Sequence, residues 1–357
     1  MQHSVDICRF PWIRRLAVDY ALNYNSLAPF FAGDPSTPEA WRNAIKRRLN
    51  LRPPSAFVEV LAAQQQSRGA PSEALAATEK LGRSDTVAIV TGQQAGLFGG
   101  PLFTLLKAVT AIKLARQLSQ EQSVPVVAVF WVDAEDHDWN EVASCAVLDA
   151  DWQVRRVVVE PPPGAGEMPV GSLKLGDGIS TAVDAMANAL PPSEFTETII
   201  NDLRRTYQSG TTMSKAFSLW LETVLGAEGL IVFDSSDPAA KPFVKTLFEK
   251  ELRNTQTAAL ATEAGKQLVA RGYHAQVTPH PESVALFRVD GVRHAIRRSN
   301  NSFTVDNAPV ELNVLLKTLD QHPEQFSPNV LLRPIVQDTL FPTVCYVPGP
   351  NELAYLA

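Results

Sequence analysis

The stretch VAIVTGQQAGLFGGPLFTLLKAVTAIKLARQL, residues 87–118, decides the fold that we predict for this chain. Residues 87–90 form a continuous apolar run, which is typical of a strand buried on both faces. Residues 91–100 hold four glycines, and Pro101 follows them at a position where the start of a helix tolerates proline. From Leu102 onward, apolar residues recur with helical spacing. The stretch therefore predicts a buried strand, a glycine-rich loop and a helix.

The glycine-rich loop predicts a binding site for an anion, because a helix N-terminus carries unpaired N–H groups and a partial positive charge. The spacing matches neither standard nucleotide-binding fingerprint, so a tight turn with glycines for packing is the alternative. Two adjacent glutamines favour a polar ligand, since their amides both donate and accept hydrogen bonds. The candidate binding residues are Thr91, Gly92, Gln93, Gln94, Gly96, Gly99 and Gly100.

A second apolar run, residues 124–132, predicts another buried parallel strand and a β–α–β unit. DAEDHDWNE follows it, so acidic side chains and a histidine fall at the carboxyl edge of the sheet, beside the glycine loop. Helix capping explains one or two of these acids, but not the whole group. The candidate catalytic residues are Glu135, Asp136, His137 and Asp138, with Asp133 and Glu141 beside them.

Three roles compete for this acidic cluster. Its carboxylates suit an ammonium group, its oxygen donors suit a divalent cation such as magnesium, and its histidine suits general acid–base chemistry. One histidine without paired cysteines is a poor zinc set, so we assign no metal site.

The last part of the chain repeats the pattern of strand, glycine turn and helix, as the second half of a doubly wound sheet would. Ser327 and Asn329 precede a predicted short helix that carries Arg333, Gln337 and Asp338, and residues 342–348 predict a strand that enters the turn. A guanidinium binds carboxylates and phosphates bidentately, so Arg333 is either a ligand clamp or a salt-bridge partner of Asp338 or Glu352. The candidate binding residues are Ser327, Asn329, Arg333, Gln337, Gly349, Asn351 and Glu352.

Composition and breaks in the pattern suggest four regions. They are an N-terminal helical region (1–82), the first half of the core (83–160), a mainly helical insertion (161–226) and the second half of the core (227–357), with a β-rich insertion near 272–306. Within the last region we predict a buried strand at 229–234, one long helix from about 240 to 270, and a hairpin turn at Asp290–Gly291.

The overall composition excludes some classes of protein. A formal net charge of −6 argues against a nucleic-acid partner, and no apolar run is long enough to span a membrane. The first residues lack the apolar core of a secretory signal. Cys8, Cys145 and Cys345 lie far apart and form no disulfide or zinc pattern, so we expect a reducing, cytoplasmic location and an inert Cys345 in the core.

Three segments resemble the bacillithiol-biosynthesis cysteine-adding enzyme family: TGQQAGLFGGPLFTLLKA (91–108), FWVDAEDHDWNEV (130–142) and SPNVLLRPIVQDTLFPTVCYVPGPNELAY (327–355). They occur in the family's order. The resemblance implies an α/β fold with a Rossmann-like parallel sheet, related to nucleotidylyltransferases and class I aminoacyl-tRNA synthetases, and inserted helical segments. It implies a ligase that adds cysteine to glucosaminyl-malate in the last step of bacillithiol synthesis.

The resemblance carries further expectations. Activating a carboxylate for amide formation requires a co-substrate, which we expect to be ATP acting through a cysteinyl-adenylate; magnesium is left open and no prosthetic group is expected. Residues 135–138 would bind the amine and move its proton, residues 92–100 would hold phosphate or substrate oxygens, and Arg333 and Glu352 would fix the malate or cysteine ends. Gln93 and Gln94 stand where a synthetase HIGH-like histidine pair would be sought. Family members also form homodimers through a C-terminal helical coiled coil, which this chain, ending at Ala357, does not reach.

Two other functions stay open. One is a nucleotidyl- or glycosyl-transferase that uses the glycine loop for a nucleotide, and the other is a non-catalytic binding or scaffold protein of the pathway.

Overall fold

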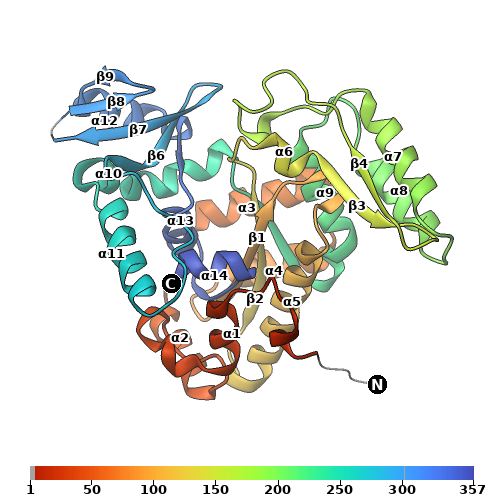
Figure 1. Ribbon diagram of the computed structural model, residues 1–357, viewed down its shortest axis with the longest axis horizontal. Helices are drawn as coiled ribbons and strands as arrows, with labels where there is room; N and C mark the ends of the chain where they lie inside the picture. Colours follow the sequence, from red (N-terminus) through yellow and green to blue (C-terminus); the bar gives the residue numbers. More distant parts are fainter. Residues whose placement is uncertain (1–4, 301) are drawn as a thin grey trace.

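A four-stranded parallel sheet forms the centre of the computed structural model, which describes residues 5–300 and 302–357 (Figure 1). Its strands, in spatial order, are β11 (Thr343–Val347), β1 (Val87–Gln94), β2 (Val126–Asp133) and β5 (Leu230–Asp234). The predicted Rossmann-like parallel sheet is therefore confirmed. The chain passes from β1 to β2 on one side, whereas β11 lies on the other side of β1. Sheets of this kind bind ligands at the carboxyl ends of strands where the strand order reverses.

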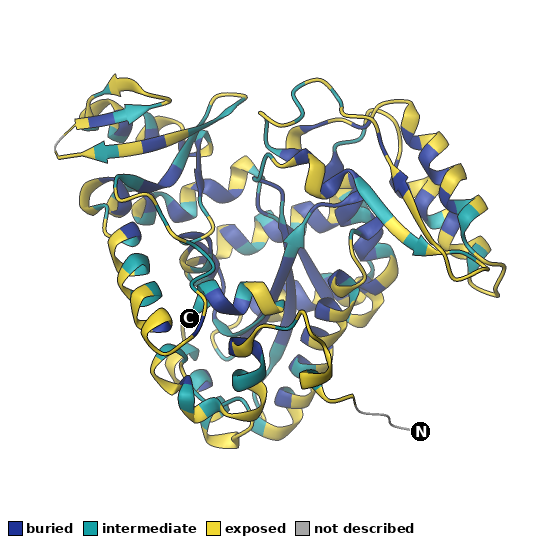
Figure 2. Cartoon of the chain, viewed as in Figure 1, coloured by how far each residue is buried: buried dark blue, intermediate teal, exposed yellow. Residues whose placement is uncertain are grey.

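Strands β1, β2 and β5 are buried on both faces, as their dark ribbons in Figure 2 show, whereas β11 at the edge is half-buried throughout. Alternate residues of β1 belong to different cores, with Ile89 packed on one face and Ala88 and Val90 on the other. The helices that cover the first face include α5 (Phe103–Gln122) and α9 (Met213–Leu225). Those that cover the second include α3 (Ser55–Arg68), α4 (Ser72–Leu81), α10 (Lys245–Asn254) and α13 (Arg333–Leu340). Burial on both faces explains the continuous apolar runs in the sequence.

Two lobes stand at the carboxyl edge of the sheet, in the upper part of Figure 1. One lobe contains α6 (Trp139–Val142), the hairpin of β3 (Ser144–Leu148) and β4 (Val154–Val158), α7 (Gly178–Ala189) and α8 (Thr196–Thr206). The other is an antiparallel sheet in the order β10 (Phe326–Pro328), β6 (Ser283–Val289), β7 (Arg293–Ser299), β8 (Ser302–Val305) and β9 (Ala308–Val310), with α12 (Leu312–Gln321). The lobes touch where the Arg293 N–H donates to the Glu167 carbonyl, at 3.2 Å.

A smaller core joins the two ends of the chain. Its helices are α1 (Arg15–Leu22), α11 (Thr257–Ala270) and α14 (Pro350–Leu356), while α2 (Pro38–Arg48) lies beside β11. Short 3-10 helices occur at Ile7–Arg9, Tyr24–Ser26, Ala28–Phe30, Leu97–Gly99, Val170–Ser172, Gly226–Glu228, Pro238–Val244 and Pro323–Gln325. No helix in the described part of the chain is both long and apolar enough to cross a membrane.

Several element boundaries differ from the prediction. β1 continues through Gln94 because it stays paired with β2 along its whole length, so residues 91–94 belong to the strand and not to the loop. The single helix predicted for residues 240–270 is wrong. Pro242 lies in a 3-10 segment that precedes α10, and Thr255, with a φ of 49°, separates α10 from α11.

The β-rich segment runs further along the chain than the sequence suggested. Its four consecutive strands extend from Ser283 to Val310, and Ser327 lies in a fifth strand rather than in a loop. The hairpin turn at Asp290–Gly291 is confirmed, with Gly291 at a φ of 99°.

Packing and one tyrosine fix the glycine loop. The Tyr207 hydroxyl donates to the Gly96 carbonyl at 2.8 Å and accepts from the Gly99 N–H at 3.0 Å. A Cβ on Gly99 would lie 2.3 Å from the Trp220 ring, and one on Gly92 would lie 2.7 Å from the Trp131 carbonyl oxygen. Close packing therefore accounts for glycine at these two positions.

We expect Gly99→Ala to destabilise the protein by about 2–5 kcal/mol, because it adds overpacking against Trp220 to the strain of a positive φ. Gly166→Ala is the matched control. Gly166 has a nearly identical φ of 88° but no atom within 4 Å of its added Cβ. Gly166→Ala should therefore lower the free energy of unfolding only by the cost of placing alanine at a positive φ, about 1–2 kcal/mol. Urea unfolding of both variants measures the difference, and equal losses would contradict the packing role of Gly99.

Candidate functional site

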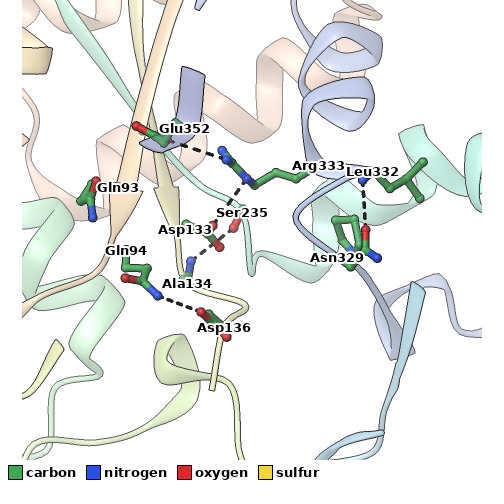
Figure 3. Close-up of polar contacts among 12 residues, drawn as sticks. Gln93, Gln94, Asp133, Ala134, Asp136, Ser235, Asn329, Leu332, Arg333 and Glu352 are labelled. Carbon is green, nitrogen blue, oxygen red and sulfur yellow. Dashed lines mark hydrogen bonds and ion pairs between the residues drawn. The ribbon is translucent and has the colours of Figure 1, made fainter. Parts of the chain in front are cut away.

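The carboxyl edge of the parallel sheet gathers polar side chains from all three segments that the sequence singled out (Figure 3). Gln93 and Gln94 lie at the end of β1, and residues 133–138 follow from the end of β2. Arg333 begins α13, and Glu352 lies in the first turn of α14, just after β11. The fold thus brings together residues that are up to about 260 positions apart in the chain.

Arg333 connects the ends of two strands. Its buried guanidinium lies with Nε 3.6 Å from Asp133 Oδ2 and Nη2 3.8 Å from Glu352 Oε1. The same group donates to the hydroxyls of Tyr346 and Tyr355, and its Cζ stands 5.8 and 5.9 Å from the centres of their rings. Of the two salt-bridge partners that the sequence suggested for Arg333, Glu352 is the one that pairs with it.

Asp338, the other partner considered, pairs instead with Arg48 of α2. Gln337 and Asp338 line a cavity of about 760 Å³ between α2 and β11, apart from the acidic cluster. Cys345 also lines this cavity, and burial raises the pKa of its thiol to about 12, which fits an inert cysteine. Gln337 is buried one turn after Arg333 on α13, and its side chain makes no hydrogen bond to another candidate residue in the described part of the chain.

Glu352 accepts hydrogen bonds from several elements. One oxygen accepts from the Gly349 N–H at 2.6 Å and from Lys107, and the other accepts from Tyr346 at 2.8 Å and from Tyr355 at 3.3 Å. Lys107 belongs to α5 and also donates to the Gly92 carbonyl at 2.5 Å. Burial lowers the pKa of Lys107, and the Glu352 carboxylate opposes this effect. These contacts join α5, β11 and α14.

Asp136 and His137 form a partly exposed pair within the acidic cluster. Asp136 Oδ2 accepts from Gln94 Nε2 at 2.8 Å, and Oδ1 accepts from the His137 backbone N–H at 2.8 Å and from Arg293 at 3.3 Å. The Asp136 and His137 side chains are 33% and 45% exposed, and His137 Nδ1 lies 3.3 Å from Asp136 Oδ1. A carboxylate and an imidazole so placed can hold an ammonium group and accept its proton.

Other acids of the cluster have structural contacts. Glu135 is buried and pairs with the buried Lys241 of the segment that precedes α10. Burial raises the pKa of Glu135, and the charge of Lys241 opposes the rise. Asp138 caps α6 by accepting from the Glu141 N–H at 3.3 Å. Capping and pairing explain these two acids, and their catalytic role stays a prediction.

Burial also raises the pKa of Asp133, at the end of β2. Arg333 opposes this rise, whereas the nearby Asp136 adds to it. Asp133 is therefore more readily protonated than an exposed aspartate, although a guanidinium lies beside it.

Two of the remaining candidate residues, Ser327 and Asn329, lie just before α13. Asn329 Oδ1 accepts from the N–H groups of Leu331 and Leu332 at 3.0 and 3.1 Å. The Ser327 hydroxyl accepts from Arg293 Nε at 3.1 Å. Asn351 lies exposed on α14.

Sequence reasoning missed several residues that hold the site: Lys107, Lys241, Arg293, Tyr346 and Tyr355. One signal was available, because Lys107 shares a helical face with the buried Thr104 and Ala111. Nothing in the local pattern indicated Arg293 or Lys241, whose partners lie more than 100 positions away.

Within residues 5–300 and 302–357, no group of three or more His, Cys, Asp or Glu residues is arranged to hold a metal ion. The acids at the edge face cations or amides instead, as Glu135 faces Lys241 and Asp136 faces Gln94 and Arg293.

Residues 4–357 match the family described as Bacillithiol biosynthesis BshC, N-terminal Rossmann-like domain. The chain belongs to this family. Proteins named "Putative cysteine ligase BshC" are similar to it along nearly all of its length. The one from Salinibacter ruber is 36% identical over 349 residues, which are 96% of this chain and 63% of the relative. The one from Koribacter versatilis is 34% identical over 357 residues, 99% of this chain and 65% of the relative.

A BshC relative from Halalkalibacterium halodurans is 31% identical over 351 residues, 96% of this chain and 64% of the relative. The chain thus spans slightly less than two thirds of the length of these relatives. The family resemblance drawn from the three segments is confirmed.

The buried pair of Glu135 and Lys241 gives a direct test of structural against catalytic importance. We expect Glu135→Ala to destabilise the protein by about 3–5 kcal/mol, because it leaves the Lys241 charge buried without its partner. The double variant Glu135→Leu with Lys241→Met should recover most of that loss, since two apolar side chains replace both charges. Urea unfolding measures both. A small loss for Glu135→Ala would contradict the structural role, and an inactive but stable double variant would favour a catalytic one.

Proposed function

We propose that this domain carries the active site of a ligase that adds cysteine to glucosaminyl-malate, the last step of bacillithiol synthesis. Membership of the BshC family and the names of the relatives support the reaction. The observation that carries the site is the accessible pair of Asp136 and His137 at the carboxyl edge of the sheet.

The reaction forms a C–N bond between the glucosamine nitrogen and the cysteine carbonyl carbon. The nitrogen loses a proton, and the group that activates the carboxyl departs with the electrons of the broken bond. Asp136 suits the protonated amine because its carboxylate faces solvent and is held by Gln94 from below. The bound ammonium has to lose one proton before its nitrogen can attack, and His137, beside it, is placed to accept that proton. A second proton leaves the nitrogen as the amide forms.

Arg333 and Glu352 are our candidates for holding the carboxylate and amine ends of the substrates. Both are already paired, so a substrate carboxylate would share the guanidinium with Asp133. Arg333 Nε is buried and makes no hydrogen bond to any described residue, so its N–H is an unsatisfied donor beside Asp133.

ATP as co-substrate rests on chemistry, because a free carboxylate does not acylate an amine without activation. Lys107, Arg293 and Arg333 each face a carboxylate. These three cations at the edge are therefore already paired and do not form a phosphate-binding site by themselves. The first turn of α5 is the remaining place for an anion there. The buried Thr104 hydroxyl in that turn has no hydrogen-bond partner among the described residues. A role for magnesium, a cytoplasmic location and a homodimer are parts of the same proposal.

The decisive test uses a bacillithiol-producing host that lacks its own cysteine-adding enzyme. The full-length protein that contains this domain is expressed as wild type, Asp136→Asn or the control Asp151→Asn, an exposed aspartate in the β3–β4 hairpin. Mass spectrometry quantifies bacillithiol and glucosaminyl-malate. Wild type and control should restore bacillithiol. Asp136→Asn should lower its rate of formation on the order of 100-fold, because the charge that holds the reacting amine in place is lost.

Glucosaminyl-malate that stays high with soluble wild-type protein would overturn the proposed reaction. A nucleotidyl- or glycosyl-transferase would then be the first alternative, and it predicts saturable binding of a nucleotide sugar without any dependence on cysteine. Full bacillithiol with Asp136→Asn would instead keep the reaction and reject the site.

A further inference from the structure

Arg293 is a buried arginine on a strand that is otherwise largely exposed. It begins β7, directly after the hairpin turn at residues 290–291, and its side chain is only 8% exposed. Its three guanidinium nitrogens contact Asp136 Oδ1 at 3.3 Å, the Ser327 hydroxyl at 3.1 Å and the Pro328 carbonyl at 2.8 Å. Its Cζ lies 3.9 Å from the centre of the Phe287 ring, which supports the guanidinium plane.

The loop after β2, residues 134–138, forms hydrogen bonds to both lobes, and we call it the acidic loop. From the first lobe, the Val170 and Gly171 N–H groups donate to the carbonyls of Asp136 and Ala134, at 2.6 and 2.7 Å. These contacts fix the backbone of the loop. From the antiparallel lobe, Arg293 reaches the Asp136 side chain itself. The backbone and the carboxylate of the same residue are thus anchored by different lobes.

Among the described residues, three donors set the orientation of the Asp136 carboxylate, and one of these three is charged. Gln94 and the His137 backbone N–H are neutral, whereas Arg293 forms a charge-assisted contact, a class that is about twice as strong. The Arg293 charge also lowers the pKa of Asp133 and of Glu135, against the rise that burial causes in both. Arg293 therefore acts on the acidic loop as a whole.

We propose that Arg293 is a positioning residue that fixes the Asp136 carboxylate in the orientation that receives the substrate amine. The role of the amine rests on the proposed function, whereas the positioning of the loop does not. A lysine cannot replace this arginine, because a single ammonium cannot reach Asp136, Ser327 and Pro328 together or stack on Phe287.

The test compares the full-length protein as wild type, Arg293→Ala and Arg293→Lys with the matched control Arg297→Ala, which removes an exposed arginine from the same strand. Steady-state kinetics with cysteine, ATP and varied glucosaminyl-malate give kcat and KM for the amine substrate. Both Arg293 variants should lower kcat/KM on the order of 10- to 100-fold, as expected for a misplaced reacting group. Adding Arg293→Ala to Asp136→Asn should cost less than about threefold more, because the residue acts through Asp136.

Hydrogen exchange supplies a readout that does not depend on activity. The His137 N–H donates to Asp136 Oδ1, so releasing that carboxylate should speed amide exchange in residues 134–138 in Arg293→Ala. Exchange in β1 and in the β3–β4 hairpin should stay as in wild type, and Arg297→Ala should change neither region.

Three results would overturn the proposal: unchanged exchange in residues 134–138, faster exchange throughout the domain, or full recovery of kcat/KM by lysine. The first removes the positioning, the second shows a general structural role, and the third shows that charge alone suffices. If the wild type forms no bacillithiol, the proposed function fails, and the exchange data alone then decide whether Arg293 positions the loop.

Discussion

The structure depends on the pairing of β1 with a parallel strand on each side. Hydrogen bonds to β2 and β11 occupy both edges of β1, and helices cover both of its faces. Its carboxyl end is therefore the part that remains for chemistry, and the polar segments of the chain meet there. Gln94 at that end lies beside Asp133 in the register of the sheet, and α14 starts just after β11. The site follows from the topology of the sheet rather than from any local motif.

Burial decides which charges at this edge are free to react. A charge removed from water destabilises the fold unless an opposite charge or hydrogen bonds compensate it. Glu135 with Lys241, and Lys107 with Glu352, meet this requirement as close buried pairs. The pair of Asp136 and His137 differs, because both side chains reach solvent. Partial exposure, together with an adjacent imidazole, thus distinguishes Asp136 from the acids that hold the edge together.

The sequence predicts the parts of this arrangement that local patterns encode. Apolar runs indicated the buried strands, and their positions before polar segments indicated the shared carboxyl edge. Long-range partners could not be predicted, because nothing near Arg293 in the chain points to Asp136, 157 positions away. Glycine was ambiguous for a similar reason. The pattern around Gly99 suits a ligand or a tight turn equally, and only the position of Trp220 shows that packing requires it.

Gln94 and His137 both lie beside Asp136, but they can serve different purposes. Its amide donates to Asp136 at 2.8 Å and therefore orients the carboxylate, but an amide cannot carry a proton away at neutral pH. An acid–base role has to come from a group that titrates, and His137 is the titratable neighbour with an accessible ring. Its Nδ1 lies 3.3 Å from Asp136 without forming a hydrogen bond in the described part of the chain. An amine that binds Asp136 therefore arrives beside the His137 ring, within reach of a proton acceptor.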